Sequence, residues 1–158
     1  MACFNCEEIG RAERGDHPWA VARLSTGYVW LDPVQYFEGL TFFVSRWCVA
    51  ELFDLEPDER AAHLMEMTEV AAAVHAAFGG HKMNYEALGN SVPHLHWWLT
   101  PRRQSDARPR GPIWEDLDFL RAMWTGPPTV PDAVRHERRA SLLNGLRRRD
   151  VLIEATFL

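Results

Sequence analysis

The first part of the chain contains short apolar runs, separated by polar residues, that predict β-strands. In AVARLSTGYVWLD, apolar runs over 20–24 and 27–31 flank a Ser-Thr-Gly turn, which predicts a hairpin. The run GLTFFVS over 39–45 is rich in aromatic and β-branched residues and predicts a third strand.

A helical period follows in EPDERAAHLMEMTEVAAAVHAAFGG, residues 56–80. Pro57 suits the first turn, acidic residues stand at the positive end, and two glycines close the segment. His63 and His75 lie in this helix and are expected to be partly exposed. One stripe at helical spacing predicts core packing and consists of Leu64, Met67, Ala71, Val74 and Phe78.

Two further strands are predicted in HKMNYEALG, 81–89, and VPHLHWWLT, 92–100. Side chains alternate between the faces of a strand, so the second one presents His94, His96 and Trp98 together. This face belongs either to an active site or to a core with two buried, hydrogen-bonded neutral histidines. The opposite face is apolar, is expected against the helix, and carries Leu95, Trp97 and Leu99.

The remainder of the chain predicts a Pro/Arg-rich loop over 101–112, helical segments around 114–124 and 131–148, and an apolar end. Six arginines in VRHERRASLLNGLRRRD form either the solvated face of a terminal helix or a face for phosphate or a partner. Strands around one long central helix indicate an α+β fold.

Length and charge narrow the functional classes. A chain of 158 residues is expected to form one compact domain, and its net charge of −5 argues against a general nucleic-acid-binding surface. The apolar runs are too short to span a membrane, and MACFNCEEIGRAERG lacks the pattern of a secretory signal. We therefore expect a cytoplasmic protein without a membrane partner.

Three cysteines in a reducing compartment do not suggest a disulfide framework. Cys3 and Cys6 form a C-x-x-C pair and Cys48 stands apart. The pair by itself is compatible with a metal clip, a redox pair or two chance small residues.

The segment NYEALGNSVPHLHWWLTPR resembles the histidine triad (HIT) superfamily, whose motif is His-φ-His-φ-His-φ-φ with φ apolar. Gly89-Asn90-Ser91 precedes the motif and Pro101-Arg102 follows it, as in the family. The resemblance covers roughly residues 3 to 115. It implies a HIT-like α+β domain over 1–115, an antiparallel sheet with a long central helix, and a C-terminal helical extension over 116–158 packed on it.

The resemblance also implies roles for individual residues. His96 matches the nucleophile that attacks an α-phosphate and forms a covalent nucleotidyl-histidine, a step for which neutral imidazole is suited. Asn90 and Ser91 match residues that hydrogen-bond phosphate oxygens. Asn84 resembles a second phosphate contact and Asp32 a ribose contact, although a turn or strand-end role fits each of these two residues equally well.

In zinc-containing members of the superfamily, the C-x-x-C pair and two histidines hold the metal. Cys48 stands where the first of those histidines is expected, and cysteine is an equally good zinc ligand. The resemblance thus implies a closed, structural zinc site made of Cys3, Cys6, Cys48 and His94.

Trp98 occupies the place of the third histidine. Indole offers one N–H donor and no acceptor, so Trp98 either stacks on a base or sugar, donates to phosphate, or closes the pocket. The expected function is that of a nucleotide hydrolase or nucleotidyl transferase, a homodimer acting on a small nucleotide or nucleotide conjugate. The alternatives are a catalytically silent nucleotide-binding protein and a specialised biosynthetic enzyme with a non-nucleotide substrate.

Overall fold

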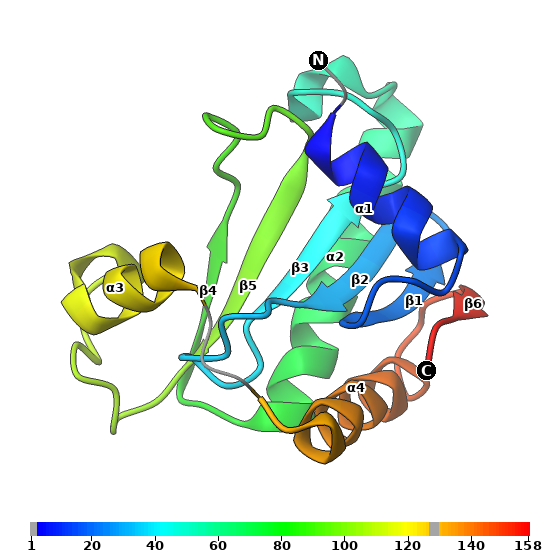
Figure 1. The fold of residues 1–158 in the computed structure, drawn as a ribbon. Helices are drawn as coiled ribbons and strands as arrows, with labels where there is room; N and C mark the ends of the chain where they lie inside the picture. The colour runs from blue at the N-terminus through cyan, green and yellow to red at the C-terminus, as the bar shows by residue number, and fades with distance from the viewer. Residues whose placement is uncertain (1–2, 127–129) are drawn as a thin grey trace.

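The computed structural model describes residues 3–126 and 130–158, and within these ranges six strands form one antiparallel sheet in the order β4-β5-β3-β2-β1-β6 (Figure 1). The strands are β1 (Ala20–Leu24), β2 (Gly27–Leu31), β3 (Thr41–Ser45), β4 (Lys82–Glu86), β5 (His96–Arg102) and β6 (Ile153–Thr156). The hairpin predicted over 20–24 and 27–31 is confirmed with the same bounds. The predicted α+β arrangement is confirmed as well.

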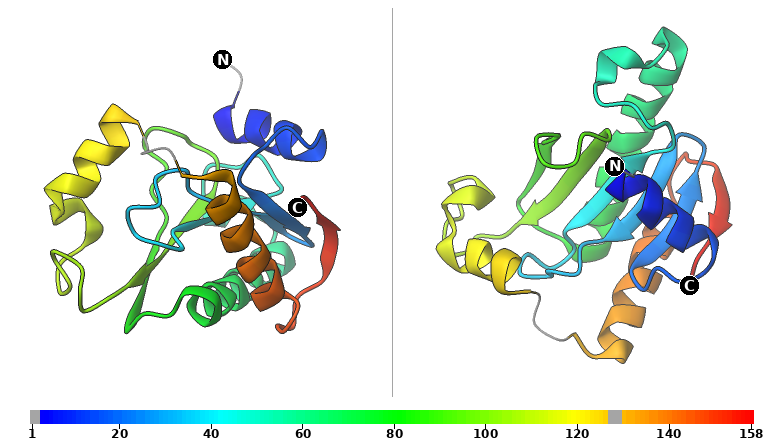
Figure 2. Two further views of the ribbon diagram at one scale, coloured as in Figure 1. Left: turned by 60° about the horizontal axis from the view of Figure 1, so that its bottom comes forward. Right: turned by 45° about the horizontal axis from the view of Figure 1, so that its top comes forward.

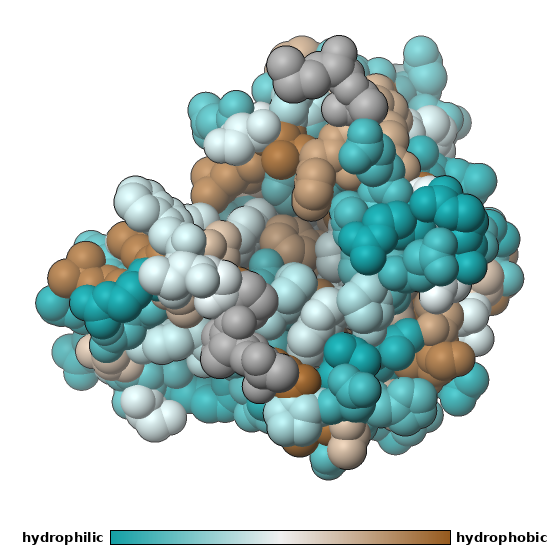
Figure 3. Space-filling view, in the orientation of Figure 1, coloured by the Kyte–Doolittle hydropathy of each residue, from teal (hydrophilic) through white to brown (hydrophobic). Residues whose placement is uncertain are grey.

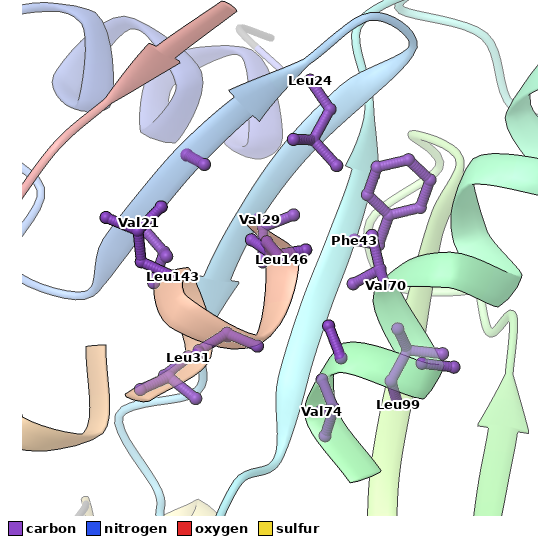
Figure 4. Packing of buried hydrophobic residues seen from close by; sticks show 14 of the residues in the cluster. Val21, Leu24, Val29, Leu31, Phe43, Val70, Val74, Leu99, Leu143 and Leu146 are labelled. Atoms are coloured by element: carbon purple, nitrogen blue, oxygen red, sulfur yellow. The ribbon is translucent and has the colours of Figure 1, made fainter. Parts of the chain in front are cut away.

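One face of the sheet is covered by α2 (Pro57–Phe78) and α4 (Asp132–Leu146), which lie side by side behind the strands (Figures 1 and 2). Apolar side chains from both helices and from β1, β2, β3 and β5 interlock there (Figure 4). The stripe predicted for the central helix supplies Met67, Ala71 and Val74 to this core. Burial of these apolar side chains is the main stabilising contribution to the fold.

The expected partial exposure of His63 is wrong, whereas His75 is exposed. His63 is 0% exposed because its ring stacks on Phe43 and is hydrogen-bonded on both sides. Trp97 Nε1 donates to His63 Nε2 at 3.2 Å, so the Nδ1 proton of His63 points to the Thr26 hydroxyl. Trp97 thus faces α2, as predicted.

The opposite face carries α1 (Phe4–Glu13) over β1 and β2, and α3 (Leu117–Thr125) beside β4 and β5 (Figures 1 and 2). The sequence pattern did not predict α1. Short 3-10 turns, η1 (Leu52–Asp54) and η2 (Ile113–Glu115), lie before α2 and α3. The surface is hollowed between α1 and α3, and apolar residues lie at the bottom of the hollow (Figure 3).

The C-terminal segment returns to the sheet. The segment predicted to be a helical extension also contains β6, which pairs antiparallel with β1. Arg139 on α4 is buried and donates to the Ala20 carbonyl at 2.9 Å, so the arginine-rich face is not wholly solvated.

A domain division at residue 115 stays a prediction. No helix within the two described ranges has both the length and the apolar character that crossing a membrane requires.

Candidate active site and metal centre

Four metal-ligating side chains converge from α1, the turn after β3 and the segment before β5. The ligand atoms of Cys3, Cys6, Cys48 and His94 all lie within 4.8 Å of one another. His94 Nδ1 is 3.3 Å from Cys3 Sγ and 3.5 Å from Cys6 Sγ. Ligand atoms around a tetrahedral zinc, with bonds of about 2.0 to 2.3 Å, lie roughly 3.3 to 3.8 Å apart, so this donor set fits zinc.

The surroundings orient these ligands. His94 Nε2 lies 2.8 Å from the Ser45 carbonyl oxygen, which can only accept, so Nε2 carries the proton and Nδ1 presents its lone pair to the thiols. Burial lowers the pKa of His94, which keeps the ring neutral. Burial opposes ionisation of Cys3, but hydrogen bonds from the backbone and thiol of Cys6 lower its pKa. Neutral imidazole and thiolate are the forms that bind a metal.

His96 is the first residue of β5 and is 7% exposed. Its Nδ1 lies 2.6 Å from the His94 carbonyl oxygen, so Nδ1 carries the proton and Nε2 keeps its lone pair. Burial lowers the pKa of His96 below its ordinary value. The ring centroid of His96 is 6.0 Å from that of Phe42 on β3.

The strand that carries His96 begins later than predicted, at His96 itself, so His94 lies in the segment that precedes the strand. The His94 N–H donates to the Val92 carbonyl at 2.8 Å, which closes a tight turn around Pro93. Proline has no N–H with which to extend the ladder. His94 lies among the cysteines and His96 lines the hollow between α1 and α3, and both histidines also line a third pocket of about 300 Å³.

Two pockets meet at His96, Val92 and Trp98. The first, here called the α1 pocket, has a volume of about 180 Å³ and is completed by Phe4, Asn5, Trp30 and Phe42. The second, here called the α3 pocket, has a volume of about 360 Å³ and is completed by Leu88, Asn90, Ser91, Trp114 and Met123. A ligand reacting at His96 has room on both sides of the imidazole.

The predicted polar contacts divide into two groups. Asn90 and Ser91 lie on the exposed loop before β5 and line the α3 pocket beside His96. Asn84 Oδ1 accepts a hydrogen bond from Arg102 Nη1 at 2.9 Å, and Asp32 Oδ1 accepts one from the Val34 N–H at 2.5 Å. Neither Asn84 nor Asp32 lines the two pockets, and burial raises the pKa of Asp32 to about 7.

Trp98 lies on the same face of β5 as His96 and is 8% exposed. Its ring centroid is 4.8 Å from Phe42 and 5.4 Å from Trp114, and it shares an apolar cluster with Phe37 and Phe119. Its Nε1 is buried without a hydrogen-bond partner in the described part of the chain. The indole therefore supports α3 and separates the two pockets.

Sequence reasoning missed eight of the pocket residues: Phe4, Asn5, Trp30, Phe42, Leu88, Val92, Trp114 and Met123. Phe4 and Asn5 stand between Cys3 and Cys6, so a metal site that included His94 would have placed them near His96. No local signal marked Trp114 or Met123. Their position depends on how α3 packs against Trp98.

Comparisons with known proteins agree with this geometry. Residues 32–105 of this chain match a HIT domain in the comparison with family models. The matched span of the HIT domain contains Asp32, the loop with Asn90 and Ser91, and the histidine motif. A comparison with the curated proteins finds no match to the sequence.

Several solved structures share the fold. A histidine triad protein from Marinobacter aquaeolei is 24% identical, with a TM-score of 0.68 over 86% of this chain and 94% of that one. A zinc-bound histidine triad family protein from Mycobacterium smegmatis is 18% identical, with a TM-score of 0.62 over 91% and 95%.

A hypothetical histidine triad nucleotide-binding protein from Sulfolobus tokodaii is 14% identical, with a TM-score of 0.64 over 90% of this chain and 92% of that one. At these identities the likenesses show the fold. The match to the HIT domain indicates nucleotide binding or nucleotide hydrolase or transferase chemistry, and the cysteine–histidine cluster indicates zinc binding.

Proposed function

We propose that this protein cleaves or transfers a nucleoside monophosphate through a covalent intermediate on His96. The observation that carries the proposal is the orientation of one nitrogen. The His94 carbonyl fixes the Nδ1 proton of His96, so the unprotonated Nε2 is left for the hollow where the two pockets meet. A positioned neutral nitrogen beside room for a phosphate is what nucleophilic attack at phosphorus requires.

In the first step, the Nε2 lone pair of His96 attacks the α-phosphorus of a nucleotide conjugate and an N–P bond forms. The bond from phosphorus to the leaving oxygen or nitrogen breaks, and the leaving atom keeps the electron pair and takes a proton from water. Asn90 and Ser91 line the α3 pocket beside His96 and would donate hydrogen bonds to the non-bridging phosphate oxygens. Such donors stabilise the charge of the transition state.

In the second step, the oxygen of a water molecule, or of another acceptor hydroxyl, attacks the same phosphorus. The N–P bond breaks, its electron pair returns to Nε2, and the acceptor loses a proton to solvent. With water, the product is a free nucleoside monophosphate. The identity of the acceptor distinguishes a hydrolase from a transferase.

The nucleoside is assigned to the α1 pocket. Phe4, Trp30 and Phe42 supply aromatic surfaces on which a base can stack, and Asn5 Nδ2 is a buried donor without a partner in the described chain. Ribose binding by Asp32 and phosphate binding by Asn84 stay predictions. Each of these two side chains already accepts a hydrogen bond from within the protein.

Zinc would be held by Cys3, Cys6, Cys48 and His94. In a closed site of this type the ion has no open position for substrate, so its contribution is structural. It would tie Phe4 and Asn5, which lie between two ligands, to the backbone carbonyl that orients His96.

The test is intact-mass spectrometry after brief incubation with a panel of nucleoside monophosphate conjugates. We expect a nucleotidyl adduct on the wild-type chain and none on His96→Ala, with nucleotide binding nearly unchanged. His75→Ala serves as a matched control, because His75 is exposed on α2 and far from the motif in sequence. Binding without adduct or turnover would instead establish a silent nucleotide-binding protein, and turnover by His96→Ala would remove this residue from the mechanism.

A further inference from the structure

The second half of α1 is attached to the sheet by packing and by hydrogen bonds. Ala12 is 1% exposed and belongs to an apolar cluster with side chains of β1, β2 and β3. Glu13 accepts hydrogen bonds from the Tyr28 hydroxyl and from Arg23 Nη1, both at 2.8 Å. These contacts do not depend on a metal ion.

The start of α1 is attached mainly through the cysteine–histidine cluster. Within the described ranges, its side-chain hydrogen bonds are those of Cys3 and Cys6 with His94, at 3.3 and 3.5 Å. Phe4 is 58% exposed, and Asn5 Nδ2 has no partner in the same ranges. The cluster therefore holds the turn that supplies Phe4 and Asn5 to the α1 pocket.

Two cysteines of this cluster are arranged to form a disulfide with each other. Cys3 is the N-cap of α1 with an extended backbone (φ −75°, ψ 121°), and Cys6 lies in the first turn. An N-cap side chain and a side chain three residues later are neighbours, and the two sulfur atoms lie within 4.8 Å of each other. Neither residue is buried, so an oxidant in the solvent can reach the pair. A C-x-x-C pair at the start of a helix is a common arrangement of reactive dithiols.

We propose that Cys3 and Cys6 form a redox switch, in which a hydroperoxide oxidises the pair to a disulfide and releases the start of α1 from the sheet. In the first step, the Cys6 thiolate attacks one peroxide oxygen, the O–O bond breaks, and a sulfenic acid and hydroxide form. In the second step, the Cys3 thiolate attacks the Cys6 sulfur, the S–S bond forms and hydroxide leaves. The two thiolates lose two electrons and the peroxide gains them. A dithiol reverses the reaction by thiol–disulfide exchange.

Oxidation of the pair removes two of the four metal ligands. Cys48 and His94 alone cannot complete a tetrahedral zinc site, so the oxidised protein should lose the ion. The disulfide lies wholly within the start of α1, so it does not replace the lost tie to β3 and β5. Phe4 and Asn5 should then leave the wall of the α1 pocket and nucleotide binding should weaken. This last effect rests on the proposed function, whereas the disulfide, the loss of zinc and the local loosening do not.

The test treats the zinc-loaded chain with a small excess of hydrogen peroxide. Non-reducing peptide mapping should find a Cys3–Cys6 disulfide, and a chromogenic chelator should detect close to one zinc released per chain. Amide hydrogen exchange should become faster over residues 4–7 and stay unchanged over residues 8–13. Binding of adenosine 5′-monophosphate should weaken by about tenfold, the order expected for loss of one aromatic contact. Dithiothreitol with added zinc should restore the starting values.

Two variants with the same set of ligand types separate the C-x-x-C pair from the cluster as a whole. Cys48→His and Cys6→His each leave two cysteines and two histidines, but only Cys48→His retains the pair. Under peroxide, Cys48→His should release zinc as wild type does, and Cys6→His should release it more slowly by about tenfold. If Cys6→His takes up no zinc, peptide mapping of the oxidised wild type decides the pairing.

A disulfide that contains Cys48, oxidation to sulfinic acid without a disulfide, or equal zinc loss from the two variants would each overturn the proposal. Unchanged hydrogen exchange over residues 4–7 of the oxidised chain would do so as well. If the reduced chain binds no nucleotide while disulfide formation, zinc release and faster exchange are all observed, the proposed function fails and the redox switch stands.

Discussion

At the residue scale, the buried histidine on α2 shows how one side chain is fixed by three elements. Trp97 of β5 donates to His63 Nε2, and His63 Nδ1 lies 3.2 Å from the Thr26 hydroxyl in the β1–β2 turn. That hydroxyl donates in turn to the Glu66 carboxylate at 2.5 Å, which also accepts from the Ser25 hydroxyl. The hydrogen bond from Trp97 requires the neutral ring, because a protonated Nε2 could not accept it.

This geometry predicts a pH dependence of stability. Burial lowers the pKa of His63 to about 4, against 6.5 in the unfolded chain, so between these values the unfolded chain binds more protons. His63 therefore destabilises the fold as pH falls from 6.5 to 4, by up to about 3 kcal/mol. Chemical denaturation across this pH range should show that the free energy of unfolding falls in wild type and falls less in His63→Gln.

Other groups titrate in the same pH range. The effect of His63 is therefore the difference in the free energy of unfolding between wild type and His63→Gln at each pH. The raised pKa of Asp32 acts with the opposite sign, since its folded form holds a proton between about pH 4 and 7 that the unfolded chain has lost. His75→Gln, on the exposed side of the same helix, should follow wild type. Parallel curves for wild type and His63→Gln would refute the assignment.

At the scale of elements, Trp98 links β5 to α3. The family's third histidine position lies under this helix, where Trp98 contacts a cluster that includes Phe37, Ile113 and Phe119. Asp116 caps α3 and also accepts a hydrogen bond from the Tyr36 hydroxyl. A tryptophan at this position thus reflects the packing of a helix that completes one wall of the pocket.

Trp98→His should therefore weaken the fold rather than simply restore a triad. Loss of most of a buried indole should lower the free energy of unfolding by about 2 to 4 kcal/mol, and Trp98→Phe should cost less because an aromatic ring is retained. Urea unfolding measures both, and amide hydrogen exchange should show faster exchange in α3 of Trp98→His. The exposed Trp124→Ala should change stability by no more than about 0.5 kcal/mol. A fully stable Trp98→His with unchanged exchange would mean that the indole does not anchor α3.

At the scale of the whole molecule, the metal cluster joins segments that are distant in sequence. Cys3 precedes α1, Cys48 follows β3 and His94 precedes β5, and 91 residues separate Cys3 from His94. A metal that binds such ligands stabilises the folded chain by its whole binding free energy relative to an unfolded chain that binds weakly.

Purified protein is expected to contain close to one zinc per chain. Cys48→Ser should lower both zinc content and melting temperature, because serine replaces a thiolate ligand. Cys48→His should largely retain both and is the matched control, since imidazole is also a good zinc ligand. Elemental analysis and thermal unfolding with and without a chelator make the measurement, and metal-free protein of unchanged melting temperature would exclude the site.

The homodimer implied by the family stays a prediction, which light scattering on the same samples tests.

The sequence by itself determined the elements whose signal is local. The hairpin of β1 and β2 and the helix α2 follow from periods of 2 and about 3.6 and from turn and capping residues, which act over a few neighbouring positions. The motif around His96 and the number of cysteines likewise pointed to the HIT family and to a metal cluster. Helix α1 was missed because its ten residues, FNCEEIGRAE, have no clear apolar stripe.

The tertiary structure alone decided what depends on contacts between distant segments. The burial of His63, the internal hydrogen bonds of Asp32 and Asn84, and the pairing of β6 with β1 each depend on a partner that local periodicity cannot identify. The same holds for α3, whose packing on Trp98 turns the altered triad position into a wall between two pockets. Sequence pattern fixes which face of an element is apolar, but the free energy of packing selects what covers that face.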